Sequence, residues 1–408
     1  MKKYIAPAFL LIAATVYFVF YHQDKALKFV PENTDILILV DTKKCTRQYI
    51  SGILEYPSLI TEKDKAGRES VSLKDTGLKV LDFIQIFHLQ GSPISQWYSV
   101  FEIKDEQKLL NYLKRQKFIG IGKRTFKKDF IFLTISDGKC LVGTSDSGFK
   151  MIPGSIRSGK NDYQADSFID GSTGSLSFIS GRGTRNFSID LNDHDIEIRN
   201  AFSEYHADSV LHHLEKKTDF LNAELDKENI NRIAGFFGID FTGDTGIESL
   251  QATAKLAEVN DTIITYGYDD HFDEIEKKTV QKILQPDYAM TLHSTHPEKI
   301  IRYFREKKWM NDRNEFTAIP FQPNKVIENK NSIEIISVRN PVKLPSGLKT
   351  NYIFIKNNPL WLPGWKTGSP AEKKIVSQLE YLFYVNRNDE HYVKLQFKKE
   401  KRPLILRP

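Results

Sequence analysis

The segment QKLLNYLKRQKF at residues 107–118 decides the predicted fold, because EKIIRYFREKKW at residues 298–309 repeats its pattern. Apolar positions match apolar positions, with the spacing of an amphipathic helix. Each segment follows a predicted strand that contains an aromatic residue, 97–104 in the first case and 288–294 in the second. The identical positions are Lys108 with Lys299, Tyr112 with Tyr303 and Lys117 with Lys308. The repeat indicates a strand–helix module that is used twice.

A second pair of segments supports the duplication. Asp75-Thr76-Gly77-Leu78 recurs as Asp244-Thr245-Gly246-Ile247, each time before a predicted strand, but its distance from the helix differs by 22 residues between the halves. An insertion is therefore required, and any strand–helix unit with a lysine-rich outer face would look similar. The predicted fold class is α+β: a duplicated module of antiparallel sheet with helices on one face, preceded by one N-terminal transmembrane helix.

Local patterns place the elements inside this frame. The run DILILVD at 35–41 has strand composition, Asp105 is placed to cap a helix, and Asp137-Gly138 is a hairpin signal. Predicted strands are 35–41, 78–90, 97–104, 130–135, 139–144, 332–338, 352–356, 379–385 and 392–397, and predicted helices are 45–56 and 105–118. The expected organisation is an anchor (1–23), a linker (24–33), a first module (34–153), a linker (154–174), a second module (175–340) and C-terminal strands with a Pro-rich loop (341–408).

The chain begins with an apolar segment, YIAPAFLLIAATVYFVFY at 4–21, behind Lys2 and Lys3. At about 1.5 Å per residue it spans roughly 27 Å, enough to cross a bilayer. The lysines predict a cytoplasmic N-terminus and an extracytoplasmic body, which is periplasmic in a Gram-negative cell. A cleaved signal peptide is the alternative, but the aromatic end of the segment suits an interfacial belt better than a cleavage site.

The amino-acid composition excludes few classes of protein. The net charge of +6 is spread over the chain, with basic clusters at Lys123-Arg124, Lys127-Lys128 and 398–402. Solvated faces explain such clusters more often than nucleic acid does, and no nucleic-acid partner is expected. Cys45 and Cys140 are the two cysteines, and they could pair in an oxidising compartment. No cofactor motif is found, and none is expected.

Two sequence patterns, one of a catalytic site and one of a metal site, lack the neighbouring residues that such sites require. A penicillin-recognising serine enzyme would need Ser-x-x-Lys, and the chain has Ser147–Lys150 and Ser346–Lys349, with Lys366-Thr367-Gly368 further on, but no Ser-x-Asn follows. The acidic stretch YDDHFDE at 268–274 lacks the glycine of an EF-hand loop, and His293 and His296 are predicted at a strand end rather than on a helix. No catalytic or metal residue is therefore assigned.

Trp361 and Trp365 lie in the Pro-rich stretch and are the one candidate ligand or partner surface. A tryptophan pair could bind sugar, a partner or a membrane interface, and it could equally fill a gap between domains.

The start of the body, VPENTDILILVD at 30–41, resembles the corresponding segment of uncharacterised membrane-anchored envelope proteins of Bacteroidota, as do Gly238-Ile239-Asp240 and the two Asp-Thr-Gly segments. This resemblance implies duplicated α+β modules behind an anchor or lipoprotein signal, and it implies no activity. The sequence thus favours an envelope protein that acts as a non-catalytic binding or scaffold component, with an envelope hydrolase or a carrier of a hydrophobic ligand as alternatives. Its expected partners are the bilayer and an envelope protein.

Overall fold

A computed structural model of the 408-residue chain describes residues 17, 20–55, 76–157, 163–181, 183–236, 245–268, 271–319, 324–344, 347–348, 350–360, 370–400 and 403–407. The chain forms two compact units. The first unit comprises residues 1–200 and 400–408, and the second comprises residues 201–399.

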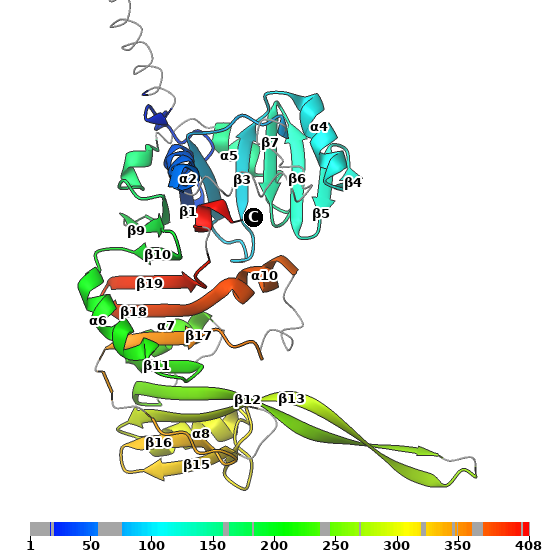
Figure 1. Cartoon of the computed structure of the whole chain (residues 1–408), viewed down its shortest axis with the longest axis vertical. Coiled ribbons are helices and arrows are strands. Elements are labelled where there is room, and N and C mark those ends of the chain that lie inside the picture. Colours follow the sequence, from blue (N-terminus) through cyan, green and yellow to red (C-terminus); the bar gives the residue numbers. More distant parts are fainter. Residues whose placement is uncertain are drawn as a thin grey trace, which may run out of the picture. The chain divides into compact units, whose positions relative to one another are not determined.

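The first unit is built on one antiparallel sheet in the order β10-β9-β8-β1-β2-β3-β7-β6-β5-β4 (Figure 1). Its strands are β1 (Thr34–Asp41), β2 (Phe83–Leu89), β3 (Tyr98–Glu102), β4 (Ile119–Gly122), β5 (Thr125–Lys128), β6 (Ile131–Ser136), β7 (Lys139–Gly143), β8 (Gly174–Ser180), β9 (Gly183–Leu191) and β10 (Asp195–Arg199). Its helices are α2 (Thr42–Glu55), α4 (Glu106–Arg115), α5 (Ile152–Arg157), η2 (Ala165–Ser167) and η3 (Leu404–Leu406).

Strand β1 has the composition of a central strand, and it lies between β2 and β8. Leu37 and Leu39 point into the main core of this unit, where they join Phe87 and Tyr98. A smaller core forms under α4, where Leu109 and Leu113 pack on strands β6 and β7. The Asp105 carboxylate caps α4 by accepting the backbone N–H of Lys108, as the sequence predicted.

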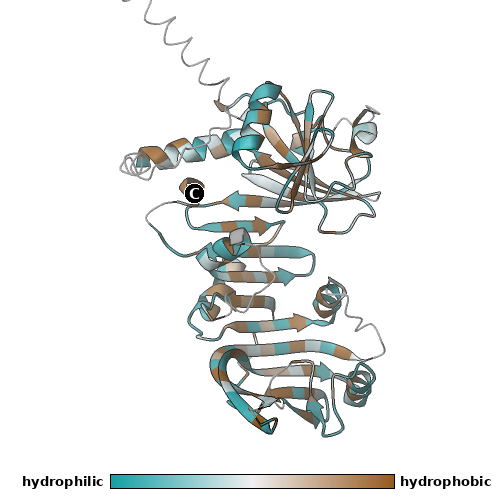
Figure 2. Cartoon of the chain, turned by 90° about the vertical axis from the view of Figure 1, so that its right-hand side faces the viewer, coloured by the Kyte–Doolittle hydropathy of each residue, from teal (hydrophilic) through white to brown (hydrophobic). Residues whose placement is uncertain are grey.

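The second unit has an antiparallel sheet in the order β14-β15-β16-β13-β12-β11-β17-β18-β19. The strands are β11 (Leu221–Asp226), β12 (Ile247–Tyr268), β13 (Glu274–Ser294), β14 (Glu315–Phe316), β15 (Asn324–Asn329), β16 (Ser332–Ser337), β17 (Asn351–Lys356), β18 (Leu379–Arg387) and β19 (Glu390–Phe397). The helices are α6 (Glu204–Glu215), α7 (Lys227–Phe236), α8 (Pro297–Glu306) and α10 (Pro370–Gln378). Apolar and polar residues alternate along many of these strands (Figure 2), as expected where one face is buried.

The predicted fold class is wrong. Strands make up 45% of the chain and helices 23%, so antiparallel sheet dominates and the structure is not a duplicated α+β module. The helices have a strong periodic signal, but they are short, and α2 with 14 residues is the longest in the described part. Several strands lack a regular alternation of apolar and polar residues, so the sequence does not mark them as clearly as it marks the helices. The prediction therefore gave the helices too large a share of the fold.

The repeated segments that suggested duplication do share a local structure. Lys117 after α4 and Lys308 after α8 both have left-handed backbone, with φ of 60° and 56°. In each case the N–H of the following aromatic residue, Phe118 or Trp309, bonds the carbonyl five residues earlier, 3.0 or 2.8 Å away. This arrangement is a Schellman helix end. The sequence match between the two segments therefore reflects the Schellman motif with which both helices end.

The predicted linker, membrane anchor and cysteine pair can also be compared with the structure. The chain passes between the two units near residue 200, whereas the predicted linker 154–174 lies within the first unit, where its described part includes η2 and the start of β8. The predicted anchor, 4–21, lies almost wholly outside the described residues. Among the residues that are described, no helix is long and apolar enough to span a membrane. Cys45 and Cys140 are both free, and burial raises the pKa of the Cys140 thiol to about 12.

Candidate functional site

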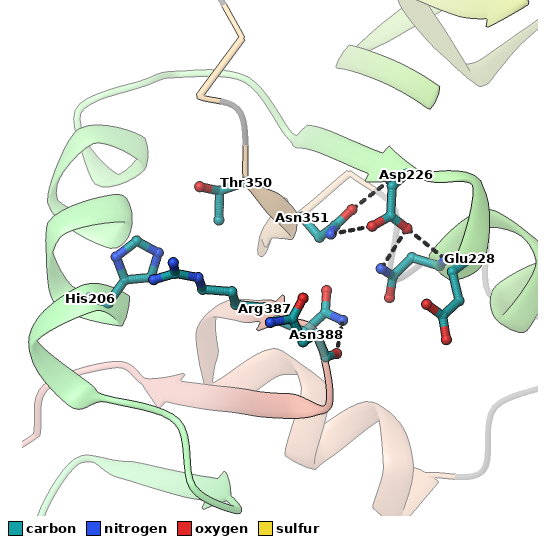
Figure 3. A pocket seen from close by; sticks show the side chains of 9 residues that line it. His206, Asp226, Glu228, Thr350, Asn351, Arg387 and Asn388 are labelled. Atoms are coloured by element: carbon teal, nitrogen blue, oxygen red, sulfur yellow. Dashed lines mark hydrogen bonds between the residues drawn. The ribbon is translucent and has the colours of Figure 1, made fainter. Parts of the chain in front are cut away.

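A polar cavity of about 440 Å³ opens in the second unit, beside the ends of β11 and β18 and the start of β17 (Figure 3). Amides and charged groups dominate its lining. The lining residues are His206, Asp226, Glu228, Asn229, Thr350, Asn351, Asn386, Arg387 and Asn388.

Asp226 organises one side of this cavity. It ends β11, and its carboxylate accepts the backbone N–H and the side-chain amide of Asn229 at 2.9 and 2.8 Å, so that it caps α7. Asn351 of β17 donates to the other carboxylate oxygen at 2.7 Å and accepts the Asp226 N–H at 2.6 Å. Burial raises the pKa of this carboxyl, but the bonds from Asn229 and Asn351 outweigh burial, and the pKa lies below its usual value.

Asn386 contributes an acceptor that has no partner. This residue is 3% exposed, and its Oδ1 makes no hydrogen bond to any described residue. Its amide donates to the carbonyl of Asn388, at 3.3 Å, in the β18–β19 turn. Asn388 has a φ of 56°, a conformation that asparagine tolerates in tight turns. This oxygen is shielded from solvent, so a molecule in the cavity could reach it only after the Asn386 side chain moves.

The charges are separated across the cavity. Figure 3 shows Arg387 running toward His206, away from the side where Asp226 and Glu228 lie. Glu228 also pairs with Arg232 of α7 through contact between Oε1 and Nη2. Asp226 is held ionised by donors, so it cannot serve as a general acid near neutral pH. The arrangement can bind a small polar molecule.

A second candidate site is the outer part of the β12–β13 pair, residues 255–287, which we call the arm. Within the sheet, β11 pairs with β12 only at 249–254, and β16 pairs with β13 only at 289–293. Beyond these residues the two strands pair only with each other in the described structure, from Lys255 with Asp287 to Tyr268 with Glu274. Fourteen residues per strand at about 3.3 Å each give a ribbon roughly 46 Å long (Figure 1).

The arm exposes large apolar side chains to solvent. Tyr266, Tyr268 and Phe272 are 69%, 72% and 85% exposed. Ile264, Ile275 and Val280 are also exposed. A two-stranded ribbon has little stability of its own in water, and each of its strands has an open edge that can pair with another chain. The arm therefore has the features of a surface that a partner covers.

The base of the arm is anchored to the sheet. Asp287 is a buried carboxylate at the inner end of the ribbon, and it accepts two bonds from Arg339, at 3.2 Å from Nε and 2.7 Å from Nη2. Asn340 donates a third bond at 2.9 Å. Paired charges of this kind hold a buried carboxylate in one geometry. The anchor fixes the position from which the ribbon leaves the sheet.

The residues singled out from the sequence do not form these sites. Trp361 and Trp365 lie outside the described residues, as do Ser346, Lys349 and 366–368. Ser147 donates to Gln96 at 2.8 Å and lies 3.2 Å from the Tyr98 hydroxyl, in a turn that follows β7. His293 is on β13, and His296 stands at the N-cap position of α8 without a capping hydrogen bond from its side chain. Among the described residues no group of three or more His, Cys, Asp or Glu side chains could hold a metal ion.

The sequence analysis missed both sites. The cavity draws its residues from α6, β11, α7, β17, β18 and the β18–β19 turn, so no local motif marks it. The arm did leave a signal: DTIITYGY at 261–268 and TVQKIL at 279–284 are rich in β-branched and aromatic residues on either side of an acidic turn. That turn was considered only as a metal loop.

Comparison with known proteins adds no functional information. No protein-family model matches the sequence, and no curated protein matches it. Among solved structures, crystal form I of TP0453 aligns with a TM-score of 0.21 and 7% identity, over 78% of this chain and 92% of that one. A likeness of this size carries no argument about fold or function.

Proposed function

We propose that this protein is a non-catalytic binding or scaffold component of the cell envelope, and that the arm is the surface that binds its partner. The apolar segment at 4–21 would attach the chain to the membrane, with the N-terminus cytoplasmic and the body extracytoplasmic. Attachment to a membrane raises the effective concentration of the arm for partners on the same surface.

One observation carries this proposal: the arm displays Tyr266, Tyr268 and Phe272 on a ribbon that no other described element supports. Isolated apolar side chains on a protein surface need no explanation, but a cluster of them indicates an interaction site. Tyrosine and phenylalanine are also enriched where protein partners meet.

Photo-cross-linking in cells tests the arm directly. A photoreactive phenylalanine analogue replaces Phe272 at the tip of the arm, and in a matched control it replaces Tyr205 of α6, which is 86% exposed. We expect a discrete cross-linked product from position 272 and none from position 205. Equal labelling from the two positions, or no product from 272, would contradict the proposal.

A second function, binding of a small polar molecule in the cavity, is favoured by its polar lining, in which Arg387 and His206 lie away from Asp226 and Glu228. The separated charges suit a ligand that carries a donor group at one end and an anionic group at the other, such as an amino acid. Calorimetric titration with the common amino acids tests this function. Binding that Arg387→Met abolishes would support it, and the absence of heat at millimolar concentrations would exclude it.

A further inference from the structure

The net charge of the chain is concentrated in one surface of the first unit. We call residues 114–130 the basic hairpin: it runs from the end of α4 through β4 and β5 into the turn before β6 (Figure 1). It contains seven lysines and arginines and one acidic residue, Asp129, so its net charge of +6 equals that of the whole chain. Six of the seven basic residues are exposed, and Lys128 is half-buried. The rest of the chain is balanced in charge, so the attraction of an anionic partner falls on this surface.

Apolar side chains are exposed among these basic residues. Ile119 and Ile121 of β4 are 70% and 48% exposed, and Phe130 in the turn after β5 is 52% exposed. Ile119 lies directly opposite Lys127 in the strand pair, so the two side chains share one face of the hairpin. Basic and exposed apolar side chains together suit an anionic bilayer, where the charges meet the headgroups and the apolar groups enter the interface.

Neighbouring acidic groups leave most of this charge uncompensated. Arg124 pairs with Glu106 of α4 at 2.6 Å, whereas Lys117 and Lys123 form no ion pair with another described residue. The preceding residues, 104–113, contain two basic and two acidic residues, so they do not change the net charge of the surface. The positive charge is therefore available to a partner outside the chain.

The first unit begins only a few residues after the apolar segment at 4–21, which the proposed function places in the membrane. Leu27 and Val30 are buried in the main core of this unit. At about 3.4 Å per residue, the chain from Tyr21 to Leu27 spans at most about 20 Å. The first unit, which carries the basic hairpin, is therefore held beside the bilayer.

We infer that the basic hairpin binds the anionic headgroups of the bilayer that holds the chain. The inference rests on the membrane attachment in the proposed function and adds a second contact with the same bilayer. Each lysine or arginine near an anionic membrane surface strengthens binding about fivefold, so the hairpin acts through several of them together. The second contact limits how the first unit can rotate on its tether.

Full-length protein reconstituted into lipid vesicles tests the inference. An environment-sensitive fluorescent amino acid replaces Ile119, and the vesicles contain either neutral lipid alone or a mixture of neutral and anionic lipid. The hairpin variant carries Lys123→Gln and Lys127→Gln in addition. The control carries Lys330→Gln and Lys343→Gln, which remove the same charge from exposed lysines of the second unit. Circular dichroism checks that each variant is folded.

We expect the emission to shift to the blue with anionic vesicles and not with neutral ones, because the probe enters the interface only where the lysines meet anionic headgroups. A titration with anionic lipid should show that the hairpin variant binds at least about tenfold more weakly and that the control binds like the wild type. Equal emission in the two kinds of vesicle, or unchanged binding by the hairpin variant, overturns the inference.

Flotation of the vesicles separates this result from the proposed function. A chain that floats with both kinds of vesicle, without a blue shift, keeps the membrane attachment and lacks the hairpin contact. A chain that floats with neither contradicts the attachment itself and the inference with it. A photoreactive residue at position 119 that labels a protein in cells, and no lipid, would assign the basic hairpin to a protein partner and also overturn the inference.

Discussion

Strand β12 passes through two environments, and the contrast between them separates what holds the fold together from what is available for binding. At 249–254 the strand lies between β11 and β13, and Thr253 and Ala254 are buried. At 255–268 the same strand pairs only with β13 in the described structure, and Tyr266 and Tyr268 are largely exposed. The inner part has its hydrogen bonds and apolar surface satisfied within the unit. The outer part leaves both open to a partner.

The largest difference should appear between a core phenylalanine and an arm phenylalanine. Phe354 of β17 is fully buried and packs against Tyr381 and Phe383, so Phe354→Ala should lower the free energy of unfolding by about 3–5 kcal/mol. Phe272→Ala at the tip removes the same atoms from an exposed site and should change it by less than about 0.5 kcal/mol. Urea denaturation followed by fluorescence measures both. Equal losses of unfolding free energy in the two variants would contradict the difference between the core and the arm.

The anchor at the base of the arm should have an intermediate effect. Arg339→Met leaves the buried carboxylate of Asp287 with only the bond from Asn340, and we expect a loss of about 1–3 kcal/mol. Lys343→Met, an exposed change nearby in the sequence, is the control and should be close to neutral. Hydrogen exchange of β12 and β13 should increase in Arg339→Met. If exchange stayed at the wild-type level, the anchoring role of Asp287 would be wrong.

The cap of α7 should have a smaller effect that depends on pH. Asp226→Asn replaces a carboxylate that accepts from Asn229 and Asn351, and it should cost about 1 kcal/mol at pH 7. Because the folded pKa lies below the usual value of 3.8, the ionised carboxylate stabilises the fold above that value. This contribution is lost as the pH falls through the lower folded pKa.

The urea midpoints of wild type and Asp226→Asn, measured from pH 7 down to pH 3, test this assignment. The two curves should differ at pH 7 and converge at the acidic end. A constant difference across the range would show that the charge of Asp226 is not what stabilises the cap.

The smallest effect on stability should accompany a large effect on binding. Tyr266→Ser and Tyr268→Ser remove exposed rings, so each should leave the free energy of unfolding within about 0.5 kcal/mol of wild type. Both should reduce the amount of cross-linked product obtained from position 272 in cells. Tyr205 of α6 is also exposed, and Tyr205→Ser is expected to alter neither quantity. A cross-linked product that is undiminished after loss of both arm tyrosines would contradict the role of the arm.

Sequence patterns predicted much of the local structure correctly. The run at 35–41 falls within β1, Asp137-Gly138 joins β6 to β7, and the segments 379–385 and 392–397 pair as β18 and β19. These elements have one buried face or a specific turn residue, and both leave a mark in the sequence.

The global class and the sites could not be predicted in the same way. No described residue of the arm from 255 to 284 is buried, so its strands lack the alternation that identifies a strand, and 22 residues of β12 were not recognised as one element. The cavity combines Asp226 with Asn351 and Asn386, which are more than a hundred residues away in the sequence and meet only because β11 pairs with β17 and β17 with β18. Pairing of this kind is a property of topology, which local patterns do not encode.

Removal of the arm tests the central claim most directly. Ala257 and Gln285 are paired in register, so residues 258–284 can be replaced by Asn-Gly to close a two-residue hairpin. We predict that the free energy of unfolding of this variant lies within about 0.5 kcal/mol of wild type, because the removed residues 258–284 are not buried. We also predict that, after chemical cross-linking in cells, it no longer co-purifies with the partner that the wild-type chain recovers. A shortened chain that still recovers the same partner would show that the arm is not the binding surface.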